Sequence, residues 1–192
     1  GMQLRFVSRE IYSQKQLPFK AAPTDFIIPE GGANEWGVHG CREILSESDS
    51  TYDYIAVSLG TGITAAGLSH ALFPQQQLLV FSALKGALTD SDFFTFADAK
   101  RCRLFEQYHC GGYAKCPPKL VHFINDFYKQ NGFLLDPIYT GKMMFGLRDL
   151  VQNGFFKDGA KILAIHTGGL QAISGMNARL KANGLLEIQT EL

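Results

Sequence analysis

An apolar segment that runs directly into a glycine-rich turn constrains the fold of this 192-residue chain more than any other feature. Residues 52–59 read YDYIAVSL, the turn reads GTGIT, and residues 63–72 are rich in small side chains. A strand that is apolar on both sides is buried on both faces, as in a parallel sheet covered by helices. The segment therefore predicts a strand, a tight turn and a helix, which together are the repeating unit of an α/β fold.

Strand-like and helix-like segments alternate along most of the rest of the chain, which predicts a mostly parallel sheet flanked by helices. Further strands are expected at residues 3–8, 25–29, 77–84, 101–107 and 161–166, the last of them central in the sheet. Helices are expected up to about residue 47, over 91–100 and 118–130, from about 141 to 154, and from 167 onward.

Charge and hydropathy exclude several classes of function. Lysine and arginine together number 18, as do aspartate and glutamate, so no net field favours nucleic acid or an anionic membrane. No apolar run approaches the roughly 20 residues that span a bilayer, and no leader precedes the first strand. We expect a cytoplasmic protein with no nucleic-acid or membrane partner.

The cysteines predict free thiols rather than a disulfide framework or a metal centre. His109, Cys110 and Cys116 are close in sequence, but their spacing does not match a zinc site and no second pair completes four ligands. Cys41 and Cys102 stand alone.

The turn after the first predicted strand is a candidate phosphate site, formed by Gly60, Thr61, Gly62, Ile63 and Thr64. Glycines allow an anion to approach the backbone closely, and the first turn of a helix presents free N–H groups. The glycine spacing does not match the dinucleotide fingerprint, and no lysine follows as in a nucleotide P-loop. A plain tight turn with a threonine cap is the alternative.

Three further residues are candidates because they follow predicted strands or glycines. Tyr139 and Thr167 are expected at the carboxyl ends of strands, where open α/β sheets bind ligands. Tyr113 follows two glycines in a loop. A tyrosine can exchange a proton or stack on a ring, but a core tyrosine, a helix cap at Thr167 and an ordinary loop at Tyr113 stay open.

Taken together, the chain resembles the D-cysteine desulfhydrase and 1-aminocyclopropane-1-carboxylate deaminase family, whose members depend on pyridoxal 5′-phosphate (PLP). The resemblance implies fold type II, the fold of the tryptophan synthase β-subunit. The motifs that carry it are IPEGGAN (28–34), VSLGTGITAAG (57–67), GYAK (112–115), LLDPIYTGK (134–142) and IHTGG (165–169).

The resemblance also implies roles for the candidate residues. The turn from Gly60 to Thr64 would hold the PLP phosphate, and Thr167 would lie near the pyridine nitrogen with Thr140 close by. Tyr113 and Tyr139 would flank a small amino-acid substrate and take part in proton transfer. Family members commonly form homodimers, so a homodimer is expected.

Two positions favour the desulfhydrase over the deaminase. The deaminases typically carry Glu directly after the tyrosine that matches Tyr139, and Leu between the His and Gly of the last motif. This sequence has Thr140 and Thr167 there. A carboxylate beside the ring nitrogen would keep it protonated and make the PLP ring a stronger electron sink, as opening of a cyclopropane requires. A threonine hydroxyl there would leave the ring a weaker sink, and a weaker sink suffices for β-elimination of a thiol.

The Schiff-base lysine of the family lies in an asparagine–lysine context that does not occur in this sequence. Lys85 and Lys142 are interpreted as structural. The resemblance then implies that residues 1–23 are the end of the smaller domain and 24–192 an incomplete PLP-binding domain. Such a chain should be inactive alone, and a non-catalytic module that binds a phosphate ligand is the alternative.

Overall fold

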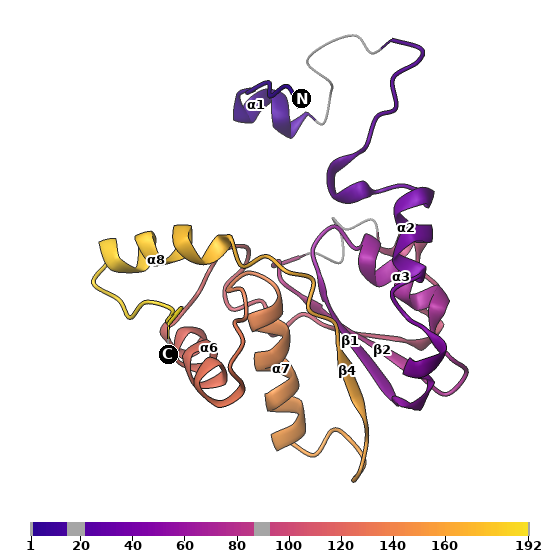
Figure 1. The fold of residues 1–192 in the computed structure, drawn as a ribbon, viewed down its shortest axis with the longest axis vertical. Helices are drawn as coiled ribbons and strands as arrows, with labels where there is room; N and C mark the ends of the chain where they lie inside the picture. The colour runs from indigo at the N-terminus through magenta and orange to yellow at the C-terminus, as the bar shows by residue number, and fades with distance from the viewer. Residues whose placement is uncertain (1, 15–21, 87–92, 192) are drawn as a thin grey trace.

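Four parallel strands form the centre of the protein, seen here in a computed structural model that describes residues 2–14, 22–86 and 93–191. Their order in the sheet is β3-β2-β1-β4, and every neighbouring pair is parallel. Helices cover both faces of the sheet (Figure 1), which confirms the predicted α/β class. The strands are β1 (Tyr54–Leu59), β2 (Gln77–Ser82), β3 (Cys102–Phe105) and β4 (Ile162–Ala164).

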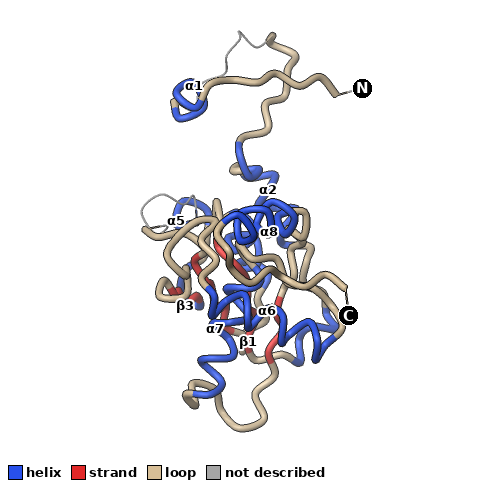
Figure 2. Tube along the Cα trace, turned by 90° about the vertical axis from the view of Figure 1, so that its left-hand side faces the viewer, coloured by secondary structure: helices blue, strands red, loops and turns tan. Residues whose placement is uncertain are grey.

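Helices precede the first strand, connect successive strands and follow the last one (Figure 2). The longer ones are α2 (Glu35–Arg42), α3 (Ile63–Ala71), α6 (Pro118–Asn131), α7 (Thr140–Gln152) and α8 (Ala172–Ala182). The short ones are α1 (Arg9–Ser13), η1 (Glu30–Gly32), η2 (Glu47–Thr51), α5 (Phe93–Phe96) and η3 (Ala99–Arg101).

Alternation along β1 divides the core between the two faces of the sheet. Ile55 and Val57 are fully buried on one face, in a cluster with residues of α2, α3 and α5. Ala56 lies on the other face, in a cluster with Met143 and Leu147 of α7. Because both sides of β1 are covered, its apolar run is explained by burial on two faces.

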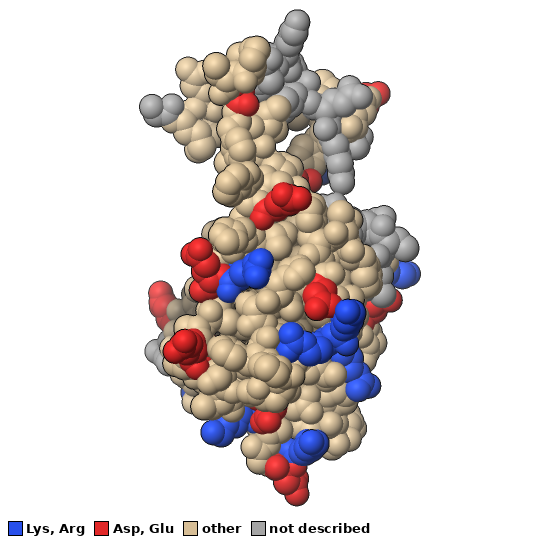
Figure 3. Space-filling model, turned by 90° about the vertical axis from the view of Figure 1, so that its right-hand side faces the viewer, with Lys and Arg blue, Asp and Glu red and all other residues tan. Residues whose placement is uncertain are grey.

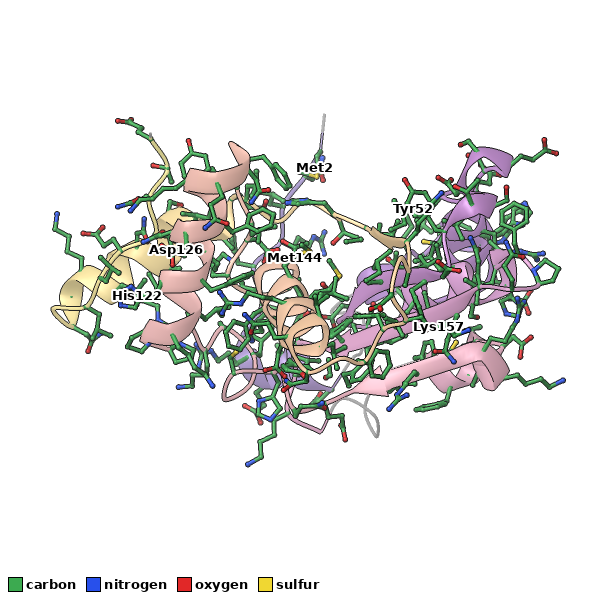
Figure 4. All side chains as sticks on the ribbon, turned by 90° about the horizontal axis from the view of Figure 1, so that it is seen from below. Met2, Tyr52, His122, Asp126, Met144 and Lys157 are labelled. Atoms are coloured by element: carbon green, nitrogen blue, oxygen red, sulfur yellow. The ribbon has the colours of Figure 1, made fainter. Side chains whose placement is uncertain are left out.

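A third cluster lies beyond α7 and joins α6 to α8. Leu120 and Ile124 of α6 pack with Ile173 and Leu180 of α8, all of them buried. In Figure 4, Met144 marks α7 while His122 and Asp126 mark α6, and α6 and α7 lie side by side. Cys110 and Cys116 also pack against this cluster, and none of the four cysteines forms a disulfide.

The N-terminal expectations were wrong. Residues 3–8 and 25–29 form no strand, and α1 follows the first of these segments. Phe6 is 93% exposed and Ile28 is 72% exposed, so neither apolar segment packs on the sheet. Alternating sequence alone cannot form a strand, because the backbone needs a neighbouring strand to bond with. In Figure 1 the arm with α1 stands apart from the sheet.

Three boundaries also differ from expectation. Strand β4 lies at the edge of the described sheet rather than at its centre. Helix α2 ends at Arg42 instead of near 47, because Ser46 and Asp49 form a capping box that starts the separate helix η2. Helix α8 begins at Ala172 rather than at 167, since Gly168 and Gly169 have φ values of 89° and 88° that no right-handed helix accommodates.

The remaining predicted elements agree with the structure to within a few residues. The expected helix over 91–100 appears as α5 and η3, with positions 91 and 92 outside the described residues. Among the residues that the structure describes, no helix has both the length and the apolar character needed to cross a membrane. On the face drawn in Figure 3, basic and acidic side chains are interspersed.

The contact between α2 and α3 gives a test of the core. A Cβ at Gly67 of α3 would overlap the Cβ of Cys41 and lie 2.7 Å from the Val38 carbonyl oxygen, whereas one at Gly175 of α8 would meet nothing within 4 Å. We expect Gly67→Ala to lower the free energy of unfolding by about 1–3 kcal/mol through overpacking. The control Gly175→Ala should raise it by about 0.5–1 kcal/mol through helix propensity.

Urea denaturation of both variants measures the two changes. Equal stabilisation by both substitutions would contradict the close approach of α2 to α3.

Candidate functional site

The turn between β1 and α3 leaves a helix N-terminus without a cap. Gly62 occupies the cap position with a φ of 102°, and no side chain accepts a hydrogen bond from the first turn. The amides that open α3, beginning with Ile63, therefore have no acceptor within the helix. The alternative of a threonine-capped turn is wrong, and the free amides are a suitable cradle for an anion.

Neighbouring groups leave no room for side chains at the glycines of this turn. A Cβ at Gly60 would lie 3.1 Å from Cε1 of Tyr139, and one at Gly62 would lie 2.7 Å from the backbone nitrogen of Phe93. Within the described residues, the hydroxyls of Thr61 and Thr64 have no hydrogen-bond partner. The turn thus brings free amides and free hydroxyls together on a backbone that glycine alone permits.

Ser58 is a residue of this site that the sequence analysis did not single out. Its Oγ is buried and has no hydrogen-bond partner among the described residues. It lies two residues before Gly60, near the carboxyl end of β1. A buried hydroxyl without a partner is costly, so it favours a ligand or a further segment that supplies one. A serine within the otherwise apolar run YIAVSL is the signal that could have identified it.

The carboxylate of Asp136 organises the second part of the site. It is fully buried and accepts hydrogen bonds from the amides of Ile138, Tyr139 and Thr140 at 2.7–2.8 Å. These amides precede or open α7, so Asp136 caps that helix. An aspartate followed by proline just before a predicted helix is the sequence signal that could have identified this residue.

The two threonines that the resemblance places near a ring nitrogen differ in their surroundings. Thr140 is fully buried, and its hydroxyl donates to the Asp136 carboxylate at 2.5 Å. Thr167 is exposed and lies in the turn after β4. It does not cap α8, where Gln171 holds the cap position without a side-chain bond. Gly169 approaches Asp136 closely, so the two threonine segments meet at that carboxylate.

Tyr113 and Tyr139, which the resemblance implies would flank a substrate, lie next to each other. Their rings pack edge to face with centroids 6.3 Å apart. Tyr113 is 57% exposed, while Tyr139 is half-buried against Gly60. Burial, with the neighbouring Tyr113 next in importance, raises the pKa of Tyr139 to about 12. At neutral pH its phenol therefore keeps its proton and can act as a donor.

Comparison with known proteins agrees with this geometry. The chain is 32% identical to a proposed 1-aminocyclopropane-1-carboxylate deaminase of Pyrococcus horikoshii, over 76% of this chain and 49% of that protein. It is 31% identical to a D-cysteine desulfhydrase of Yersinia enterocolitica, over 77% of this chain and 51% of the relative. The chain is a homologue of the D-cysteine desulfhydrases and 1-aminocyclopropane-1-carboxylate deaminases.

Two further comparisons support this family relationship. The crystal structure of a homologue of the deaminase superposes with a TM-score of 0.65 at 28% identity, covering 81% of this chain and 52% of that one. A bifunctional D-cysteine desulfhydrase/1-aminocyclopropane-1-carboxylate deaminase of Arabidopsis thaliana is 27% identical over 88% of this chain. The chain spans about half the length of these curated relatives, and no protein-family profile matches it.

Lys142 of this desulfhydrase and deaminase homologue holds the loop that carries Tyr113. Its side chain is 1% exposed, and its Nζ donates to the carbonyl oxygens of Ala83 at 3.1 Å and Gly112 at 2.8 Å. Burial lowers its pKa from the usual 10.5. Because these bonds link α7 to the end of β2 and to the residue before Tyr113, the interpretation of Lys142 as structural is supported.

The role of Asp136 predicts a large loss of stability when it is replaced. Asp136→Ala leaves three amides and the Thr140 hydroxyl without their acceptor, so we expect unfolding free energy to fall by about 3 kcal/mol or more. The control Asp126→Ala, on the exposed side of α6, should change it by less than about 0.5 kcal/mol. Urea denaturation distinguishes them, and equal effects would contradict the capping role.

The raised pKa of Tyr139 predicts a stability difference in alkali. Between pH 10, where an unfolded tyrosine ionises, and about 12, the folded protein retains a proton that the unfolded chain loses. Stability contributed by this group is therefore present below pH 10 and lost as the pH rises through that window. Denaturation at pH 9 and 11 should show a smaller loss for Tyr139→Phe than for the wild type, and equal losses would be inconsistent with burial of the phenol.

Proposed function

We propose that this chain carries the cofactor-phosphate and tyrosine side of a PLP-dependent lyase of the D-cysteine desulfhydrase type. The observation that supports it most is the uncapped start of α3 lying directly against Tyr139 at Gly60. An anion-binding cradle and a protonated phenol are thereby adjacent. The proposal is also supported by sequence relatives named as a desulfhydrase and a deaminase, and by the similar fold of a deaminase homologue.

In this proposal the segment from Gly60 to Thr64 binds the phosphate of PLP through backbone amides and the two threonine hydroxyls. Near the carboxyl end of β1, the Oγ of Ser58 has no partner among the described residues and would be satisfied by a polar ligand. Thr167 and Thr140 would lie toward the pyridine ring, with Asp136 holding Thr140 in place. PLP, when bound, supplies an electron sink for the bonds at the α-carbon of an amino acid.

The tyrosines would handle protons on the substrate side. Tyr139 holds its proton at neutral pH and can give it to a departing thiolate. Tyr113, on the exposed rim of the pair, would shield the substrate and position it against Tyr139. The overall reaction would convert D-cysteine and water to pyruvate, ammonia and hydrogen sulfide.

Thr140 and Thr167 favour the desulfhydrase over the deaminase within this proposal. The deaminase pattern has a carboxylate at the first of these positions, whereas Thr140 offers a hydroxyl already bonded to Asp136. The deaminase is nevertheless a real alternative, because relatives of both names match the chain at similar identity. For a complete form that carries the Schiff-base lysine, an assay that measures both sulfide from D-cysteine and 2-oxobutyrate from the cyclopropane amino acid distinguishes them.

The source of the Schiff-base lysine, the division at residue 23 and the homodimer stay predictions. We propose that the chain binds PLP without forming an adduct that borohydride can reduce, because none of its lysines lies in the asparagine–lysine context of the family. Binding without turnover of either substrate would favour the non-catalytic alternative.

The phosphate cradle predicts a preference for PLP over pyridoxal. We expect PLP to bind at least about tenfold more tightly, because amides and hydroxyls bond the phosphate. Replacing Thr61 and Thr64 with Val should weaken PLP binding by about fivefold per hydroxyl and leave pyridoxal unaffected. The control Thr51→Val, before β1, should change neither.

Fluorescence titration of the purified protein with each compound measures these affinities. Equal affinity for PLP and pyridoxal would rule out the assigned phosphate site.

A further inference from the structure

A carboxylate that the resemblance does not explain lies at the rim of the site. Glu30, the first residue of η1, is exposed, and its Oε1 accepts a hydrogen bond of 2.6 Å from the hydroxyl of Tyr12. Both residues belong to the N-terminal segment that precedes the sheet. Among the residues described by the structure, Glu30 has no basic partner to neutralise it.

One contact connects the Glu30 segment to the loop from Gly60 to Thr64, and a second connects that loop to Tyr139. Gly31, the next residue, packs so closely on the side chain of Thr61 that a Cβ there would overlap it. Gly31 also has a φ of 65°, a conformation that glycine adopts freely. One residue before Thr61, Gly60 contacts the Tyr139 ring. The segment with Glu30 is thus held directly over the turn that faces the substrate tyrosines.

Electrostatics agree with this placement. The pKa of Tyr139 is raised mainly by burial, then by Tyr113, and in smaller part by the carboxylates of Asp136 and Glu30. The pKa of Tyr12 is raised mainly by its hydrogen bond to Glu30, and in smaller part by the charge of Tyr113. The Glu30 carboxylate therefore acts on the space beside the tyrosine pair from the solvent side.

We propose that Glu30 determines side-chain specificity, favouring amino acids whose side chain or leaving group is cationic and disfavouring anionic ones. This inference rests on the proposed function, because it assumes that the substrate lies beside Tyr113 and Tyr139. A carboxylate at the rim attracts a nearby ammonium and repels a second carboxylate. Tyr12 is a positioning residue that fixes the carboxylate through its hydroxyl.

The test uses stable phosphopyridoxyl amino acids, which join cofactor and amino acid without any lysine. Derivatives of D-2-aminobutyrate, D-2,4-diaminobutyrate and D-aspartate carry neutral, cationic and anionic side chains. Calorimetry at low ionic strength gives their affinities for the wild type, Glu30→Gln and the control Glu47→Gln, whose site lies before β1. Glu30→Gln removes the charge while keeping an oxygen that can accept from Tyr12.

We expect the wild type to bind the cationic derivative about three- to tenfold more tightly than the anionic one, the range of an exposed charge pair. Glu30→Gln should abolish this preference without changing the affinity for the neutral derivative, and Glu47→Gln should retain it. Tyr12→Phe should reduce the preference only in part, since the carboxylate remains.

The outcomes separate the two proposals. If the neutral derivative does not bind the wild type, the proposed function fails and this inference fails with it. If it binds but Glu30→Gln leaves the charge preference unchanged, the proposed function stands and the role of Glu30 is refuted. A loss of affinity for all three derivatives in Glu30→Gln would also overturn the inference, since it would indicate a structural role.

Discussion

The hydrogen bonds of the buried Asp136 carboxylate fix the geometry on which the candidate site depends. By accepting from three successive amides and from the Thr140 hydroxyl, this one side chain determines where α7 begins. The start of α7 in turn places the Tyr139 ring against Gly60. Because these donors are buried or partly buried, each would be costly without its acceptor.

Helix α7 then links the site to the rest of the core. One turn after Tyr139, Lys142 reaches the end of β2 and the Gly112 carbonyl, which holds the loop of Tyr113. On the inner side, Met143 and Leu147 pack on the sheet with Ala56. A buried capping carboxylate and a buried amine thus position two tyrosines that come from segments 26 residues apart. The turn from Gly60 to Thr64 follows β1, which is buried on both faces, and its Gly60 lies against the Tyr139 ring.

The elements predicted correctly are those whose hydrophobic pattern or glycines lie within a single short segment. The apolar run of β1, the glycines after it and the helical spacing of α6 and α7 all appear where they were expected. The N-terminal segments failed because a strand needs a partner that sequence alone does not reveal, and Phe6 and Ile28 remain exposed. The edge position of β4 depends on strand order, which periodicity does not contain.

The candidate site was predicted in its composition but not in its supporting bonds. Tyr113 and Tyr139 were named from motifs, and the structure brings their rings together. The Thr140 hydroxyl donates to Asp136, four residues earlier, a bond that the motif did not show. Ser58 and Glu30 were missed because their significance depends on what surrounds them. Ser58 has a buried hydroxyl with no partner among the described residues, and Glu30 has an exposed carboxylate held by Tyr12.

The central claim is that the uncapped amides of α3 bind the phosphate of PLP, and amide chemical shifts test it most directly. A ¹⁵N-labelled sample titrated with PLP should show its largest shifts between Gly60 and Thr64, with inorganic phosphate shifting the same amides more weakly. Shifts confined to exposed lysines, with the residues from Gly60 to Thr64 unmoved, would contradict the account.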